Sequence, residues 1–222
     1  NTELMDGDSL NFSGSGTGQV VNEGVITLSQ GGYAVLAAPS VRNTGSIQAS
    51  LGTVVLAAGD ALTLDLASTG LVGYQIGTVN GTQVENNGSI FANNGTVYLD
   101  AAVASNVAAS VVNQQGQINA ESFSMGPDGA IHIRGGNIDQ NGELRTGGSI
   151  GRGDISVIAE GDLYIGNDSS IIAGGFSDGG RIALVGRGTA TIEGNIDARR
   201  GGSLMIGRSD GLDRVANVSL PS

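Results

Sequence analysis

The chain has 222 residues, of which 39 are glycine, and its 21 acidic and 10 basic side chains give a net charge of −11. So acidic a chain does not attract phosphate backbones, which excludes nucleic acid and anionic membranes as expected partners. Proline is scarce, no Gly-X-Y period occurs and no apolar run of about 18 residues is present, which excludes collagen and a membrane-spanning helix.

A seven-residue unit with asparagine at its third position recurs in the first half of the chain. Its copies are Val20–Ile26, Val41–Ile47, Val84–Ile90 and, with one residue inserted, Val111–Ile118. The first two asparagines are 21 residues apart, and the next gap of 43 residues is close to twice that. At one corner of a repeating structure, we expect hydrogen bonds along a stack of Asn22, Asn43, Asn86 and Asn113. The alternative is that these residues only favour turns, and both interpretations make them structural.

A second unit, which begins with glycine and continues with alternating apolar residues, follows the first. It reads Gly32–Ala38, Gly52–Ala58 and Gly95–Ala101, and the second half of the chain keeps only its Gly-x-apolar-x-apolar form, as in Gly129–Ile133 and Gly153–Val157. Short alternating segments of this kind are typical of half-buried strands. We expect the glycines between them to supply the positive φ that sharp corners need.

Short strands that repeat about every 21 residues predict an all-β fold, a parallel β-helix (solenoid) in which each coil covers the next. We expect about ten coils, with small aliphatic side chains filling a narrow lumen. The segment Leu66–Thr82 breaks the period and is predicted to form a small extra hairpin outside the helix, with Tyr74 exposed on it. The alternative is that its apolar residues, such as Leu71 and Ile76, cover a neighbouring turn.

The run from Val41 to Leu66, VRNTGSIQASLGTVVLAAGDALTLDL, resembles the secretion domain of filamentous haemagglutinin-like exoproteins, the large two-partner secretion exoproteins of Gram-negative bacteria. The segments Leu10–Gly14, Val20–Gly24 and Val84–Leu99 resemble the same family. Beyond about residue 120 the chain is similar to the family only as a glycine-rich shaft. We therefore predict a secretion-domain-like β-helix over residues 1–120 and a continuing β-helical shaft over residues 121–222.

The resemblance implies a right-handed β-helix that is exported through an outer-membrane partner transporter, and a location outside the cell or on its surface. Exoproteins of this family act as adhesins, haemagglutinin-like filaments, toxin carriers or biofilm components. The expected partners are therefore surface glycans or receptors on host or neighbouring cells. Family members carry an Asn-Pro-Asn-Gly-type motif early in the secretion domain, which this chain lacks. We expect the chain to be a fragment or a processed form of a longer precursor.

Few residues suggest a chemical site. The tripeptide Arg152-Gly153-Asp154 is the sequence that integrins read, which makes it a candidate receptor-binding site, and the alternative is a plain turn. His132, the only histidine, lies in an alternating segment and is expected to face solvent.

The distribution of acidic residues argues against catalysis. Parallel β-helices include polysaccharide-active enzymes, which need clustered carboxylates. Here no two acidic residues are adjacent, and Asp60 and Asp65 are five positions apart. We expect no enzyme activity, no cofactor and no metal site.

The arginines are distributed unevenly, because only Arg42 precedes residue 130. The arginines closest to the end are Arg181, Arg187, Arg199, Arg200, Arg208 and Arg214. An acidic and a basic end would favour head-to-tail stacking through open strand edges, and the alternative is a solvated arginine-bearing face. The leading hypothesis is a secreted adhesin or structural filament segment that acts by multivalent display. The alternatives are a self-assembling head-to-tail filament or sheath subunit and a polysaccharide-active enzyme.

Overall fold

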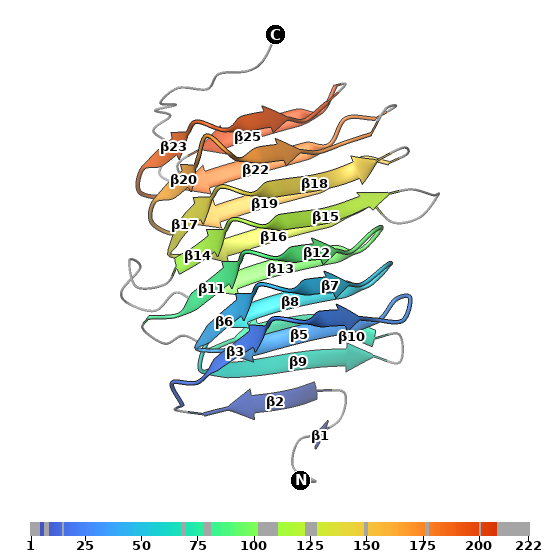
Figure 1. Ribbon diagram of the computed structural model, residues 1–222, viewed down its shortest axis with the longest axis vertical. Helices are drawn as coiled ribbons and strands as arrows, with labels where there is room; N and C mark the ends of the chain where they lie inside the picture. Colours follow the sequence, from blue (N-terminus) through green and yellow to red (C-terminus); the bar gives the residue numbers. More distant parts are fainter. Residues whose placement is uncertain are drawn as a thin grey trace.

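The computed structural model describes residues 5–6, 9–14, 16–67, 70–77, 81–101, 111–122, 128–148, 151–175, 178–199 and 201–207. These residues form strands and turns, and three parallel sheets of seven strands each make up the shaft (Figure 1). Within this part of the chain, no helix is long and apolar enough to cross a membrane. The all-β class predicted from the alternating segments is confirmed.

Each coil contributes one strand to each sheet. The first sheet contains β3 (Gln19–Asn22), β6 (Ser40–Asn43), β11 (Gln83–Asn86), β14 (Val111–Gln114), β17 (Asn137–Gln140), β20 (Leu163–Ile165) and β23 (Ala190–Ile192). The second contains β4 (Val25–Thr27), β7 (Ser46–Gln48), β12 (Ser89–Phe91), β15 (Gln117–Ser122), β18 (Glu143–Gly148), β21 (Ser170–Ile172) and β24 (Asn195–Asp197). The third contains β5 (Tyr33–Ala38), β8 (Thr53–Ala58), β13 (Thr96–Ala101), β16 (Ala130–Gly135), β19 (Asp154–Ala159), β22 (Arg181–Gly186) and β25 (Ser203–Gly207).

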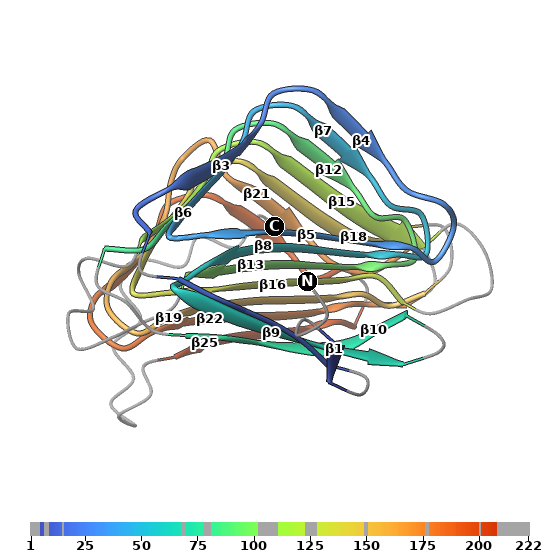
Figure 2. The ribbon, with the colours of Figure 1, turned by 90° about the horizontal axis from the view of Figure 1, so that it is seen from below.

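The coils wind in one direction around a triangular cross-section (Figure 2). Seen from the N-terminal end, the chain passes from the first sheet to the second and then to the third, and it turns clockwise as it recedes. That sense is right-handed, as it is in nearly all crossovers between parallel strands. The molecule is therefore a right-handed parallel β-helix, as predicted.

The length of a coil changes along the shaft. Asn22 pairs with Asn43, 21 residues later, which is the repeat read from the sequence. In the second half, Gln117 pairs with Glu143, 26 residues later. These longer coils, together with residues diverted into an extra hairpin, contribute to the difference between the seven strands that each sheet has in the described residues and the ten coils predicted for the chain. The sheets continue across residue 120 without a break, because β14 pairs with β17 and β15 with β18.

Aliphatic side chains fill the lumen in axial columns. In the third sheet, Val54, Val97, Ile131, Ile155 and Ile182 occupy one register position on consecutive strands, and each is at most 1% exposed. Alternation places the neighbouring residues on the outer face. Burial of these columns is the main source of stability that the sequence supplies.

A four-stranded antiparallel sheet lies against the outer face of the third sheet (Figure 2). It contains β1 (Met5–Asp6), β2 (Ser9–Ser13), β9 (Ala61–Ala67) and β10 (Gly70–Ile76). The predicted extra hairpin is β9–β10, which begins at Ala61 and not at Leu66. Val55 and Ala57 of β8 alternate toward the outside, yet both are fully buried, because the hairpin covers them. The apolar residues of the insertion therefore cover neighbouring coils.

Glycines at the corner between the first and second sheets allow the coils to approach closely. A Cβ added at Gly45, Gly88, Gly116 or Gly142 would lie only 2.0–2.1 Å from the carbonyl oxygen of the glycine one coil earlier. None of the four has a positive φ. The expectation that these corner glycines serve a left-handed backbone was wrong, since their role is to leave room for the preceding coil. Positive φ is found at the corner before the third sheet, where glycines supply it as expected and Leu51 also adopts it. The glycines are Gly31, Gly153, Gly174 and Gly201.

We predict that Gly88→Ala destabilises the protein by about 1–3 kcal/mol, because the added methyl group overlaps the backbone of the preceding coil. The matched control is Gly24→Ala, at the same corner of the first described coil, where a Cβ would meet nothing within 4 Å. Its effect is expected to stay within about 0.5 kcal/mol. Urea unfolding followed by circular dichroism measures both. Equal effects of the two substitutions would contradict the proposed role of the corner.

Candidate functional site

Three rings from distant parts of the sequence meet on the outer face of the third sheet. Tyr98 of β13 and His132 of β16 are register partners, and their rings stack with centroids 5.1 Å apart and planes inclined by 22°. Tyr74 of the hairpin strand β10 contacts Tyr98 edge-on, with centroids 5.3 Å apart. The expectation that Tyr74 is exposed was wrong, because Tyr98 and Asp100 hold it half-buried against the sheet. His132 lies on the outer face, as expected, but it is also half-buried.

Polar groups stand beside these rings. The Tyr74 hydroxyl donates to the carboxylate of Asp100 over 3.3 Å. Arg134 is the register partner of Asp100 on the next strand, and its side chain is exposed. Burial raises the pKa of Asp100, although the charge of Arg134 and the hydrogen bond from Tyr74 oppose that shift. Burial, together with the charge of Asp100, raises the pKa of Tyr74, so this hydroxyl keeps its proton and remains a donor.

The rings and polar groups enclose a cavity of about 220 Å³, which we call the aromatic hollow. Its lining includes Tyr74, Tyr98, Asp100, His132, Arg134 and Ser156. Sites for drug-sized ligands are usually ~300–1,000 Å³, so the hollow matches a single ring-sized group. A few polar groups around an aromatic surface are the usual composition of a small-molecule site.

The sequence repeat contains enough information to predict part of the aromatic hollow. Tyr98 and His132 each stand three positions after the glycine that opens their unit, Gly95 and Gly129. Aligning the units on that glycine places the two rings in one column. Tyr74 comes from the insertion, which has no counterpart in the repeat, so its position followed from no periodicity.

The predicted asparagine stack lies inside the lumen, beside the corner glycines. Asn22 donates to Asn43, Asn43 to Asn86 and Asn86 to the side chain of Gln114, each over 2.7 Å. The prediction that Asn113 is the fourth member of the stack was wrong. Asn113 pairs with Glu85 on the outer face, whereas Gln114 pairs with Asn86. In register, the unit begins at Val112, the partner of Val84, and contains no inserted residue. Reading it from Val111 shifts it by one residue, and such a shift exchanges the two faces of a strand.

The Arg152-Gly153-Asp154 tripeptide lies at a corner that enters β19. Gly153 is buried, with φ of +136°, and a Cβ there would lie 2.4 Å from the hydroxyl oxygen of Thr146. Asp154 belongs to a central strand and is flanked in register by Ala130 and Arg181. The side chains of Arg152 and Asp154 are exposed, but the backbone between them is held in the shaft and does not form a projecting loop. Integrin binding stays a prediction.

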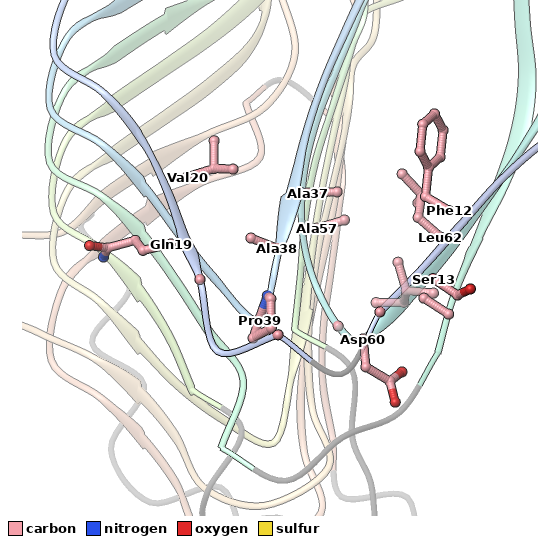
Figure 3. Close-up of a pocket in the computed structure, with 16 residues that line it drawn as sticks. Phe12, Ser13, Gln19, Val20, Ala37, Ala38, Pro39, Ala57, Asp60 and Leu62 are labelled. Atoms are coloured by element: carbon pink, nitrogen blue, oxygen red, sulfur yellow. The ribbon is translucent and has the colours of Figure 1, made fainter. Parts of the chain in front are cut away.

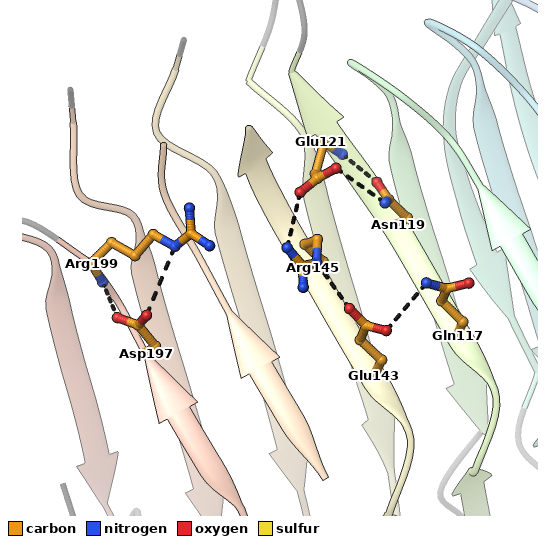
Figure 4. Close-up of polar contacts among 7 residues, drawn as sticks. All are labelled: Gln117, Asn119, Glu121, Glu143, Arg145, Asp197 and Arg199. Carbon is orange, nitrogen blue, oxygen red and sulfur yellow. Dashed lines mark hydrogen bonds and ion pairs between the residues drawn. The ribbon is translucent and has the colours of Figure 1, made fainter. Parts of the chain in front are cut away.

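On the outer face of the second sheet, polar side chains form a network in which they are hydrogen-bonded or ion-paired to one another (Figure 4). Arg145 forms ion pairs with Glu143 at 2.9 Å and with Glu121 at 3.5 Å. Gln117 donates to Glu143, and Asn119 donates to Glu121. Because these carboxylates already have partners on adjacent strands, the network is better suited to holding β15 against β18 than to binding a ligand.

A larger groove of about 340 Å³ lies between the antiparallel sheet and the corner that follows β5 (Figure 3). Its lining includes Phe12, Val20, Ala38, Pro39, Asp60 and Leu62. Small apolar side chains and glycine backbone make up most of the described lining, with Asp60 as the charged group. Its lining therefore offers fewer polar groups for recognising a ligand than the lining of the aromatic hollow does.

In the described part of the chain, no group of three or more His, Cys, Asp or Glu residues is placed to hold a metal ion. Asp65 accepts a hydrogen bond from the Ser9 hydroxyl within the antiparallel sheet. No protein-family model matches the chain, and no curated protein is significantly similar to it. The aromatic hollow is therefore selected as the candidate site on geometry alone.

We predict that Gln114→Ala costs about 1–3 kcal/mol of stability, because it leaves the buried amide of Asn86 without its acceptor. The matched control is Asn113→Ala, one position earlier on the outer face, with an expected effect within about 0.5 kcal/mol. Urea unfolding of both variants measures the difference. A larger loss of stability in Asn113→Ala than in Gln114→Ala would indicate instead that Asn113 belongs to the stack.

We predict that acidification destabilises the protein through His132. Burial lowers the pKa of His132 below its ordinary value of 6.5, although the charge of Asp154 opposes the shift. The unfolded chain therefore binds the proton more readily, and stability is lost as the pH falls from 6.5 through the folded-state pKa. The measurement is the unfolding free energy of wild type and His132→Gln between about pH 8 and pH 5. Parallel curves for the two proteins would show that His132 does not contribute.

Proposed function

We propose that the chain is a segment of a secreted cell-surface adhesin or structural filament of a Gram-negative bacterium, which acts by displaying side chains on a rigid β-helical rod. The observation that carries the proposal is the continuous register of the three sheets. Each inner strand is hydrogen-bonded on both sides, so outer side chains occupy fixed positions about 4.8 Å apart along the axis. Such a surface offers repeated contacts without a catalytic step.

The proposed partners follow from the surface and from the resemblance to haemagglutinin-like exoproteins. Outer-face residues such as Asn113, Asp139 and Tyr164 form a polar column on the first sheet, with hydroxyl, amide and carboxylate groups that match the hydrogen bonds of glycans. Surface glycans or receptors on host or neighbouring cells are the proposed ligands, and an outer-membrane partner transporter is the proposed export route. No cofactor is part of the proposal.

We predict that multivalent presentation strengthens binding. Beads coated densely with the purified chain should bind a glycan array with an apparent affinity about 10²–10⁴-fold above that of the soluble chain. Beads coated with chain unfolded in urea serve as the control, since they carry the same composition without fixed positions. Failure of the folded coating to bind any glycan or cell surface would contradict an adhesive function.

A second candidate function, end-to-end assembly, is favoured by the two ends of the lumen. Ile26 and Leu36 in the first described coil, and Leu204 and Ile206 in the last, are only partly buried although they point inward. Arg181 and Arg199 lie near the second end, whereas Arg200, Arg208 and Arg214 fall outside the described residues. Rods that lengthen with concentration in electron micrographs would favour this candidate over the isolated shaft.

A further inference from the structure

We propose that the aromatic hollow binds a single neutral sugar ring of a glycan, which stacks on the free face of His132 above Ser156. This inference rests on the proposed adhesive function and supplies its ligand class and its site. It follows from an incomplete stack of rings, from a balanced pair of charges and from a wall made by the inserted hairpin.

The stack of rings ends at His132. Tyr98 covers one face of the imidazole, and the next register position in the column is Ser156, a small side chain. Among the described residues, no further ring continues the stack. Strands in a sheet lie about 4.8 Å apart, close to the 5.1 Å between the two existing rings. A ring-shaped ligand that sits over Ser156 therefore continues the stack at its own spacing.

The polar groups of the hollow select a ligand with hydroxyl groups. Asp100 offers carboxylate oxygens as acceptors, and Arg134 offers guanidinium donors from the neighbouring strand. A sugar hydroxyl both donates and accepts, so it can use both groups, while the C–H face of a pyranose packs on an aromatic ring. One carboxylate and one guanidinium leave the hollow without net charge. An anionic ligand would gain from Arg134 but would be repelled by Asp100 and Asp154.

The hairpin makes the hollow deep enough to hold a ligand. Tyr74 on β10 rises beside Tyr98 and forms one wall, and its hydroxyl is fixed on Asp100. The opposite part of the lining comes from Ser156 and Ile158 of β19, beyond the edge of the hairpin. A ligand over Ser156 is thus bounded by the sheet below and by the His132 ring at its side, which removes water from the stacked face.

The single histidine of the chain provides a direct reporter. The full chain is titrated with methyl β-galactopyranoside, methyl α-glucopyranoside and the acidic methyl glucuronide, while the imidazole carbon-bound protons of His132 are followed by NMR. The expected result is a saturable shift with at least one neutral glycoside. Ser156→Phe should fill the position over His132 and weaken that binding by about tenfold or more. Ser170→Phe, at an outward position of the second sheet, is the matched control and should bind as wild type does.

The outcomes separate this inference from the adhesive function. Absence of a His132 shift with every neutral glycoside, an unchanged affinity in Ser156→Phe, or a response to the glucuronide alone would overturn the inference. If beads coated with Ser156→Phe still bind the glycan array as wild type does, the chain is adhesive through another surface and the inference fails alone. If His132 titrates with a neutral glycoside but coated beads bind no surface, the sugar site stands and the adhesive function fails.

Discussion

The shaft depends on backbone hydrogen bonds that join each coil to the next, and these bonds continue through the corners. The carbonyl groups of Gly24, Gly45 and Gly88 each accept a hydrogen bond from an amide of the following coil over 2.8–2.9 Å. A side chain at this corner would occupy the position of that carbonyl group. Without glycine the coils could not approach closely enough for the sheets on both sides to keep one register, and the columns of the lumen would be lost.

A fixed register separates the requirements of the two faces of a strand. The inward columns must fill a lumen of constant width, so they repeat Val, Ile and Leu. The outward column that contains Val55, Tyr98, His132 and Ser156 has no such requirement, and its members differ in size, polarity and charge. A binding site can therefore be placed on this fold without changing the core, which is why the fold alone does not define a function.

The sequence was informative where a pattern repeats and uninformative where it does not. Alternating residues and glycine punctuation were sufficient for the parallel β-helix, because every coil repeats the same burial. Strand β9 alternates just as a shaft strand does, so periodicity could not show that Ala61 starts a hairpin. The exchange of Asn113 for Gln114 has another cause, since two consecutive valines precede Asn113 and only the second, Val112, is the register partner of Val84. Starting the unit at Val111 shifts it by one residue and reverses the faces.

The inserted hairpin decides where the outer face can bind a ligand. A flat sheet face leaves any bound group largely in water, so stacking on it gives little desolvation. By covering Val55 and Ala57 and ending beside Tyr98, the hairpin turns one part of this face into a hollow with a wall. The same insertion that interrupts the repeat therefore distinguishes one coil from the others. A solenoid of near-identical layers needs such an interruption to create a unique site.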